Sequence, residues 1–598
     1  MVNAHKLKEL FGTPQLPGQS IWLSAGTLRA ELKGPNLGSI YFDGVEVLRG
    51  ISFLVRDENW GTCPAKVTGL KFSCRKNAFT VSYKAEASGG TAKLTYHATV
   101  SATPNQLVFH AKAIPEKDFK TNRTGFVVLH PINGVAGRPL TVTHTDGTNQ
   151  RARFPKLISP GQPFFEICGL EHTPAPGLKA KVQMEGHKFE MEDQRNWSDA
   201  SYKTYVCSLL EPWPYVLQGG QAFEQKITLT ITGRTKMPPR ITSDSLQIGR
   251  SFKLPEIGVA IQQDQAEPSL KSAKRILQLA PKHLTCALDG AEEMGAACAA
   301  YATLSASTGI PVTLEIVLPG KSTAESEMST VAKAVLQSGL EPKRIVVTQA
   351  HDLKSFQPTD KRPWGPSYEE MASAARKYFP AAEIGGGMMS YFTELNRKRP
   401  PLGLFDFITH SICPIVHDAS DAAVMQTLES LPHIFATAKS FIGKSPYHLG
   451  PSSIGARMNP YGSAPAHNPK SQRVCLAAND PRQNGSFAQT WNLGVLLAAG
   501  QASLQSVTLS SIHGPQGLID GNGVTNPLFN FLSQITPFSG KRVAAIRSQD
   551  STIIGFAAKT EKGVMAWLAN RGEKVITFSL NGKRIRLLGY QMRVVKLN

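Results

Sequence analysis

The central stretch that decides the fold is VTLEIVLPGKSTAESEMSTVAKAVLQSGLEPKRIVVT, residues 312–348. It begins and ends with short apolar runs, residues 312–317 and 345–348, which have the composition of buried strands. Between them, Ser322 and Glu325 form a capping box, apolar residues follow at helical spacing, and Gly339 ends the helix. The stretch therefore predicts a strand, a helix and a second strand in succession.

The same alternation of strand and helix continues on both sides of this stretch, from about Pro255 onward. Short apolar runs, most of them separated by helical sequence, predict a (β/α)8 barrel of the TIM type over residues 246–540. The runs are residues 257–261, 285–288, 312–317, 345–348, 382–384, 405–410, 447–449 and 506–510. An open doubly wound sheet is the structural alternative. A dinucleotide-binding version of it is weakened because no G-x-G-x-x-G motif follows the first run.

The predicted barrel is flanked on both sides by sequence of β type. Residues 1–245 carry short alternating runs punctuated by turn signals such as Asp43-Gly44, which predicts a large antiparallel β-sandwich. By analogy of size alone, this sandwich is similar to the supersandwich of mutarotase relatives. After about Lys541 the alternation returns, with a turn at Asn581-Gly582, so residues 541–598 are predicted to form a small β domain.

Composition and charge restrict the classes of partner. The net charge is +20, but the basic residues are scattered along the chain, so we expect no nucleic-acid partner and instead a basic surface that would attract acidic metabolites. No apolar run approaches the roughly 20 residues that cross a bilayer, and the first residues lack the apolar region of a signal peptide, so no membrane partner is predicted. The 8 cysteines show no C-x-x-C spacing, which favours reduced thiols in the cytoplasm.

Polar side chains gather where barrel enzymes place their reacting groups, in the segments expected to follow the strands. Histidine and carboxylate side chains transfer protons there, arginine holds an oxyanion or a carboxylate, and amides bind hydroxyl groups. Each lone histidine also has a structural alternative, which is to cap a loop or to donate to a backbone carbonyl. The candidates are Asp289, Glu394, Asn396, His410, His417, His448, Arg457, Asn459, Asp480, Arg482 and His513.

Several known mechanisms do not match this pattern. The chain has neither a G-x-S-x-G nor an H-E-x-x-H motif. His410 and His417 could share a metal ion with Asp418 or Asp289, but their spacing is not diagnostic, so no metal and no cofactor are predicted. The best-known barrel glycosidases carry glutamates at the ends of the fourth and seventh strands, where this sequence has Gln349 and His448.

A second polar constellation lies in the N-terminal β region. Residues 189–205 combine carboxylates with Arg195, Trp197, Asp199 and Lys203, and residues 55–62 have a similar mixture of charged, asparagine and tryptophan side chains. Such a mixture suits a sugar, whose ring stacks on an aromatic face while its hydroxyls are held by polar groups. A buried ion-pair network that attaches the sandwich to the barrel is the alternative.

Four segments of the sequence are distinctive: residues 144–147 (HTDG), 192–205 (EDQRNWSDASYKTY), 386–397 (GGMMSYFTELNR) and 459–462 (NPYG). They resemble segments of the bacterial D-apionate lactonase family. The resemblance extends over nearly the whole chain and implies the same order of β-sandwich, barrel and small β domain. It also implies hydrolysis of D-apionolactone to D-apionate in the degradation of the plant sugar apiose, with a sugar lactone or sugar acid as the small-molecule partner.

Roles for individual residues follow from the chemistry of lactone opening, which needs an activated water, donors for the oxyanion and an acid for the leaving alkoxide. We predict His448 or Glu394 as the base, Arg482 or Arg457 as the oxyanion holder and His410 as the acid. The predicted substrate-binding residues are Asn396, Arg457, Asn459, Asp480, His417, Arg195 and Trp197. Two alternatives stay open: a glycoside hydrolase-like barrel enzyme acting on a plant-derived sugar or uronic-acid glycoside, and a non-catalytic sugar-binding protein.

Overall fold

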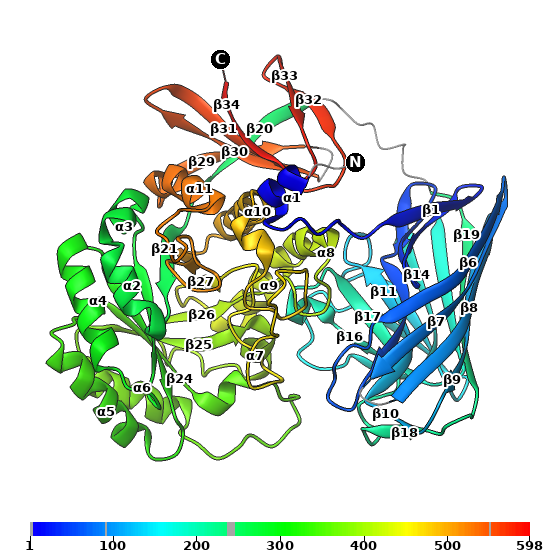
Figure 1. Ribbon diagram of the computed structural model, residues 1–598, viewed down its shortest axis with the longest axis horizontal. Coiled ribbons are helices and arrows are strands. Elements are labelled where there is room, and N and C mark those ends of the chain that lie inside the picture. Colours follow the sequence, from blue (N-terminus) through cyan, green and yellow to red (C-terminus); the bar gives the residue numbers. More distant parts are fainter. Residues whose placement is uncertain (1–3, 90–91, 236–244, 549–551, 598) are drawn as a thin grey trace. The chain divides into compact units, whose positions relative to one another are not determined.

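The computed structural model describes residues 4–89, 92–235, 245–548 and 552–597 (Figure 1). The chain divides into two compact units, which we describe separately. The barrel unit contains Met1–Leu16, Asn196–Asp199 and Ile241–Asn598. The sandwich unit contains Pro17–Arg195 and Ala200–Arg240.

The sandwich unit is built from long antiparallel strands that join into one 17-stranded sheet, with β10 and β18 paired separately. Figure 1 shows this sheet folded into layers, with β7–β9 in one layer and β11, β16 and β17 in another. The strands are β1 (Ser20–Ala25), β2 (Leu28–Lys33), β3 (Asn36–Phe42), β4 (Val45–Leu48), β5 (Gly50–Arg56), β6 (Ala65–Arg75), β7 (Ala78–Gly89), β8 (Ala92–Thr103), β9 (Gln106–Pro115), β10 (Phe119–Thr121), β11 (Arg123–Pro131), β12 (Pro139–His144), β13 (Asn149–Arg153), β14 (Phe164–Ala175), β15 (Leu178–Glu185), β16 (Phe189–Glu192), β17 (Ser201–Val206), β18 (Tyr215–Leu217) and β19 (Phe223–Gly233).

The period of two in these strands places apolar side chains on the inner face. Along β9, for example, Leu107, Phe109, Ala111 and Ala113 are buried while the residues between them are more exposed. Side chains of this kind from most strands meet in one continuous hydrophobic core. The predicted antiparallel β-sandwich is therefore confirmed.

The centre of the barrel unit is a ring of eight parallel strands. Their order in the sheet is β26-β25-β24-β23-β22-β21-β28-β27, and the ring closes where the Ile408 amide donates to the Pro446 carbonyl (2.9 Å) beside a parallel bridge between Ile408 and Tyr447. The strands are β21 (Glu256–Ile261), β22 (Leu284–Asp289), β23 (Val312–Leu318), β24 (Arg344–Gln349), β25 (Glu383–Tyr391), β26 (Phe407–Ser411), β27 (His448–Ser452) and β28 (Ser506–Ser511). The predicted (β/α)8 barrel is confirmed, and the open-sheet alternative is wrong.

Helices surround this ring and one precedes it. They are α1 (Ala4–Phe11), α2 (Ala266–Lys271), α3 (Ala273–Leu279), α4 (Gly295–Thr308), α5 (Ala324–Gln337), α6 (Tyr368–Tyr378), α7 (Phe392–Arg397), α8 (Asp421–Gln426), α9 (Leu431–Ile442), α10 (Phe487–Gln501) and α11 (Pro527–Ile535). Within the described residues, no helix is both long enough and apolar enough to cross a membrane.

Helix α5 begins one residue later than the sequence pattern predicts. Thr323, not Ser322, is the N-cap, and its hydroxyl accepts from the Ser326 amide. The carboxylate of Glu327 accepts from the backbone amides of residues 320–322, so it provides the hydrogen-bond partner for the N–H groups that precede the helix. The predicted capping box at Ser322 is wrong because this more distant carboxylate takes those donors.

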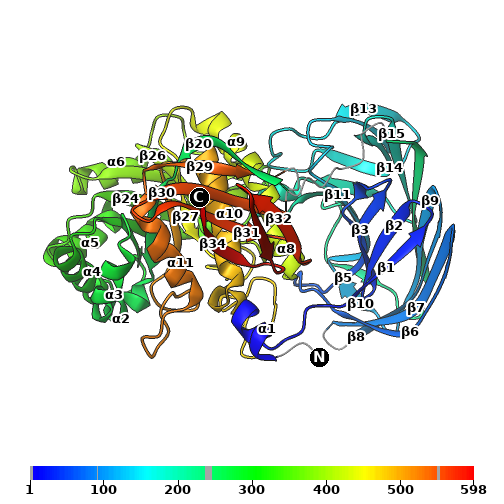
Figure 2. The same cartoon turned by 90° about the horizontal axis from the view of Figure 1, so that it is seen from above.

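The C-terminal β domain is a seven-stranded sheet in the order β33-β32-β20-β29-β30-β31-β34. Its strands are β20 (Ser245–Lys253), β29 (Arg542–Arg547), β30 (Ile553–Thr560), β31 (Gly563–Asn570), β32 (Ile576–Leu580), β33 (Lys583–Leu587) and β34 (Met592–Leu597). Figure 2 shows the sheet beside α10, which contacts β20, β30, β31 and β34. Asn581 and Gly582 both have positive φ (50° and 76°), as a tight hairpin turn of this type requires.

Candidate active site

The barrel interior carries a buried ion pair. Strand β23 alternates, so that Thr313 and Glu315 face a small cavity of about 20 Å³ inside the barrel. The side chain of Glu315 is 2% exposed and pairs with Nη2 of Arg457, from the loop after β27. Nη1 of Arg457 is buried and has no hydrogen-bond partner within the described residues. Arg457 thus presents a charged donor that Glu315 fixes but does not saturate.

Hydrogen bonds of Asn459 and Tyr391 order the loop after β27, which carries Arg457. Oδ1 of Asn459 accepts from the amides of Tyr461 and Gly462, both at 3.0 Å. The hydroxyl of Tyr391, at the end of β25, donates to the Met458 carbonyl at 2.6 Å. Asn459, which we predicted to bind substrate, thus supports the loop that carries Arg457.

A histidine–carboxylate pair joins the loop after β26 to residues 196–199, which belong to the same unit. Nδ1 of His417, in the loop after β26, lies 2.7 Å from Oδ2 of Asp199. The carbonyl of Asp199 accepts from the Ser430 hydroxyl at 2.7 Å, which holds Asp199 in place. The two side chains are 18% and 14% exposed. Because Nδ1 donates to the carboxylate, Nε2 is the ring nitrogen left to bind a water or a substrate, as in acid–base sites.

Trp197 connects this pair to the loop that carries Arg457. Its ring lies edge-on to His417 with centroids 5.8 Å apart, and it packs on Tyr461 at 5.2 Å. The guanidinium of Arg397 lies over the same ring at 5.7 Å. Trp197 itself is only 1% exposed, so it orients its neighbours and offers little surface to a substrate.

Glu394 and Asn396 lie on α7 and are buried among other polar groups. Glu394 pairs with Lys398 at 2.8 Å. Nδ2 of Asn396 donates to Oδ1 of Asn196 at 2.9 Å, and its oxygen accepts from Arg399 at 2.7 Å. These contacts hold residues 196–199 against the barrel within the same unit.

The two histidines predicted as acid and base are buried and make contacts of their own. His410 is buried on β26, where Nε2 accepts from the Tyr447 hydroxyl (2.6 Å) and burial lowers its pKa to about 4. His448 is the first residue of β27 and stacks on Phe407 with centroids 4.4 Å apart, and burial lowers its pKa to about 3. The expectation that His448 lies at the carboxyl end of its strand is therefore wrong, because β27 continues for four residues beyond it, to Ser452.

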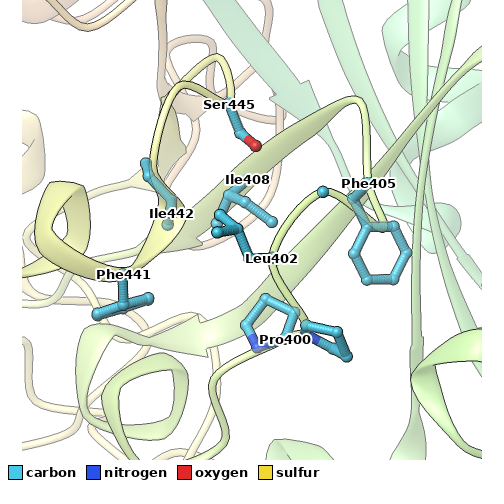
Figure 3. Close-up of a pocket in the computed structure, with 9 residues that line it drawn as sticks. Pro400, Leu402, Phe405, Ile408, Phe441, Ile442 and Ser445 are labelled. Atoms are coloured by element: carbon cyan, nitrogen blue, oxygen red, sulfur yellow. The ribbon is translucent and has the colours of Figure 1, made fainter.

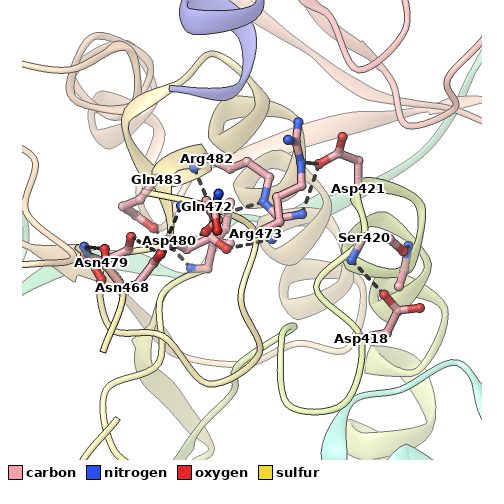
Figure 4. A network of polar contacts seen from close by, with 12 residues as sticks. Asp418, Ser420, Asp421, Asn468, Gln472, Arg473, Asn479, Asp480, Arg482 and Gln483 are labelled. Carbon is pink, nitrogen blue, oxygen red and sulfur yellow. Dashed lines mark hydrogen bonds and ion pairs between the residues drawn. The ribbon is translucent and has the colours of Figure 1, made fainter. Parts of the chain in front are cut away.

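Arg482 and Asp480 belong to a buried ion network (Figure 4). Nε and Nη2 of Arg482 donate to the two oxygens of Asp480 at 2.9 and 2.6 Å, and Nη1 donates to Asp421 at 3.1 Å. Asp421 also accepts from Nε of Arg473 at 2.8 Å. Since each guanidinium nitrogen of Arg482 donates to a carboxylate, the network orders the loop after β27 and offers no obvious donor to an oxyanion.

Arg195 occupies a comparable position in the sandwich unit. It is fully buried and forms a bidentate pair with Asp193 at 2.8 and 2.7 Å. Nη2 also donates to the Pro155 carbonyl at 2.8 Å, and the guanidinium lies over Tyr202 at 4.6 Å. Arg195 is thus engaged in a buried ion pair with Asp193 of the same unit.

Two further hollows lie in the barrel unit. A crevice of about 10 Å³ beside the C-terminal end of α9 is lined mainly by proline, leucine, isoleucine and phenylalanine side chains (Figure 3). A cavity of about 340 Å³ lies at the amino ends of the strands, beside Glu256, Arg344, His448 and Ser506. In the described part of the chain, no three histidine, cysteine, aspartate or glutamate side chains lie close enough together to hold a metal ion.

Sequence reasoning missed Glu315 and the role of Asp199. Glu315 occupies an inward position of an otherwise apolar strand, and this alternation of Thr313 and Glu315 with apolar residues was the available signal. Asp199 is 218 positions from His417, so nothing in the local sequence pairs them.

Comparisons with known proteins cover both large regions of the chain. A family model described as "D-apionate lactonase, TIM barrel domain" matches residues 257–540, and one described as "D-apionate lactonase, N-terminal domain" matches residues 8–234. A D-apionate lactonase from Brucella anthropi is 40% identical over 586 residues, which cover 96% of each chain.

Similar solved structures are more distant. The GH36 α-galactosidase AgaA from Geobacillus stearothermophilus is 9% identical, covers 94% of each chain and gives a TM-score of 0.27. A family 39 glycoside hydrolase from Bacteroides cellulosilyticus is 9% identical, covers 81% of this chain and 97% of its own, and gives a TM-score of 0.40. Likenesses at these scores carry no argument about substrate.

Proposed function

Since the chain belongs to the D-apionate lactonase family, we propose that it hydrolyses D-apionolactone to D-apionate. The observation that carries the proposal is the 40% identity to a named D-apionate lactonase along 96% of the chain. The free thiols of all eight cysteines fit the cytoplasmic location that we propose with it.

His417 is the proposed base and Asp199 its partner. Nε2 of His417 removes a proton from water while the water oxygen forms a bond to the lactone carbonyl carbon. Asp199, 2.7 Å from Nδ1, fixes the tautomer and stabilises the imidazolium that results. This assignment replaces His448, which stacks on Phe407 at the start of β27, and Glu394, which pairs with Lys398.

Arg457 is the proposed oxyanion holder. Its Nη1 would donate to the negatively charged oxygen of the tetrahedral intermediate, because among the described residues that nitrogen has no hydrogen-bond partner, while Glu315 holds Nη2. When the intermediate collapses, the carbonyl reforms and the bond from the carbonyl carbon to the ring oxygen breaks. The imidazolium of His417 then gives its proton to the leaving alkoxide, and the new carboxylic acid loses its proton to solvent.

A lactone panel tests the activity. Purified protein is mixed with D-apionolactone and with aldonolactones of other ring sizes, and acid release is followed with a pH indicator. We expect saturable acid release above the spontaneous rate, fastest with D-apionolactone. Release of reducing sugar from glycosides without acid release from lactones would favour the glycosidase alternative, and neither reaction would favour a sugar-binding protein.

A further inference from the structure

In the part of the sandwich unit that the structure describes, one buried arginine has no counter-ion. Arg123, the first residue of β11, is only 7% exposed. Its Nε is buried and has no hydrogen-bond partner, and no ion pair or hydrogen bond of its guanidinium occurs within the described residues. A buried cation normally requires a paired carboxylate or several acceptors, because its desolvation costs several kcal/mol. Arg195 of the same unit has such a partner, because Asp193 pairs with its guanidinium.

Aromatic rings occupy the faces of this guanidinium and leave its edge for another ligand. The Cζ of Arg123 lies 3.6 Å from the centroid of Tyr205 and 5.2 Å from that of Trp60. Such contacts stabilise the charge, but they do not satisfy the N–H donors, which point outward in the guanidinium plane. The neighbouring carboxylate of Glu190 accepts from Tyr205, Ser208 and the Leu209 amide instead.

Exposed indole surface lies next to Trp60, one of the two rings that cover the arginine. Trp213 is 51% exposed, and its ring is edge-on to Trp60 with centroids 5.4 Å apart. Trp60 has a left-handed backbone with φ of 66°, which is unfavourable for a bulky residue, and Nη1 of Arg56 donates to its carbonyl at 2.8 Å. Lys203 adds positive charge nearby and is paired with Glu192. The segment that contains Trp60 thus holds its indole next to the guanidinium of Arg123.

We propose that Arg123, Trp60 and Trp213 bind a hydroxylated carboxylate of the sugar-acid class on the sandwich unit. The guanidinium edge would take the carboxylate through two parallel hydrogen bonds, and the indoles would take the C–H face of the carbon chain. The choice of a sugar acid rests on the proposed function, whose product belongs to that class. The site itself does not depend on turnover in the barrel.

The test measures binding of D-gluconate to the intact protein by calorimetry and by tryptophan fluorescence. We expect saturable binding, weakened about tenfold to a hundredfold by Arg123→Gln, since a charged hydrogen bond of this kind contributes that much. Trp213→Ala, at a position that is 51% exposed, should weaken it severalfold and reduce the fluorescence change. Sorbitol, which lacks the carboxylate, should not compete.

Arg29 and Trp22 provide the matched control. In the same unit, the Arg29 guanidinium lies over the Trp22 ring at 5.0 Å, but both side chains are exposed, so no desolvated charge awaits a ligand. Arg29→Gln and Trp22→Ala should leave D-gluconate binding unchanged.

The proposal is overturned if no saturable binding occurs up to about 10 mM D-gluconate. It is equally overturned if Trp213→Ala and folded Arg123→Gln bind as the unmodified protein does, or if His417→Gln in the barrel abolishes the binding. Absence of lactone turnover together with retained, Arg123-dependent binding would refute the proposed function alone.

Discussion

Both ends of the barrel carry histidine side chains, but those at one end are buried and His417, at the other end, is partly exposed. At the amino ends of the strands, His448 stacks on Phe407 and lies near His283, and burial lowers the pKa of each histidine to about 3. In the loops that follow the carboxyl ends, His417 is partly exposed and pairs with Asp199. The first arrangement keeps imidazole neutral and packed, whereas the second leaves a ring nitrogen available for proton transfer.

This difference follows from barrel geometry. The amino ends are covered by short connections and contribute mainly to stability, while the longer loops after the strands converge on one face and carry the chemistry. The arginines show the same distinction within that face, since Arg482 donates to carboxylates from each guanidinium nitrogen and Arg457 retains a donor. Whether a side chain can act on a substrate therefore depends less on its residue type than on whether its polar atoms already have hydrogen-bond partners in the folded protein.

The largest expected effect comes from replacing the histidine at each end of the barrel by glutamine and comparing the two variants. His417→Gln should lower kcat by a factor of about 10² to 10⁴, because glutamine cannot relay a proton. His448→Gln should keep kcat within a few-fold and lower only the free energy of unfolding. Steady-state kinetics on folded variants measure this contrast. The comparison fails if His448→Gln loses activity while His417→Gln keeps it.

The second prediction contrasts two arginines of the same loop region. Arg457→Met should lower kcat about 10²- to 10³-fold, the usual loss for one oxyanion donor, with little change in stability. Arg482→Met should instead cost about 3–5 kcal/mol of unfolding free energy, because it leaves Asp480 buried without its partner. Urea unfolding and kinetics on the same preparations separate the two. Equal loss of kcat in both would mean that Arg482 also touches the reacting atoms.

The sequence predicted the fold well because every barrel strand carries a strong local signal. All eight predicted runs overlap strands β21–β28. The boundaries were less accurate: β25 extends to Tyr391 through three glycines, which have low strand propensity, and β20 pairs with β29 and β32 although it precedes the first barrel strand. Such pairings join segments that are hundreds of residues apart, and no local pattern encodes them.

Site residues were predicted by type and approximate position, and that is where local reasoning was insufficient. A shift of a few residues placed His448 at the wrong end of β27, and nothing in the sequence distinguishes the saturated Arg482 from Arg457. His417 was predicted as a substrate-binding residue and considered as a metal ligand, but not as the base, because its orienting partner, Asp199, lies in a distant segment. Hydrogen-bond saturation is a property of the folded chain.

A smaller effect is expected from Glu315, which fixes Arg457. Glu315→Gln should lower kcat about tenfold, since it replaces a charged partner by a weaker acceptor and leaves Arg457 in place. KM should change little, because the proposed role is expressed in the transition state. The matched control is Glu394→Gln, which removes a buried carboxylate paired with Lys398, outside the proposed catalytic pair. If Glu394→Gln lowers kcat more than Glu315→Gln, the proton-transfer site lies on α7.

The smallest predicted effect concerns stability against pH at the amino end. His448 has a folded pKa of about 3, well below the ordinary value of 6.5, because burial disfavours its charged form. Between those two values the unfolded chain binds a proton that the folded chain does not, so stability is full above pH 6.5 and falls as the pH decreases toward 3. The contribution is at most about 1.4 kcal/mol per pH unit. In urea unfolding at pH 7 and pH 5, His448→Gln should therefore lose less stability on acidification than the unmodified protein. His417→Gln, which removes a partly exposed histidine, serves as the reference. If His417→Gln reduces the loss of unfolding free energy between pH 7 and pH 5 more than His448→Gln does, the buried neutral histidine is His417 and the comparison of the two barrel ends is wrong.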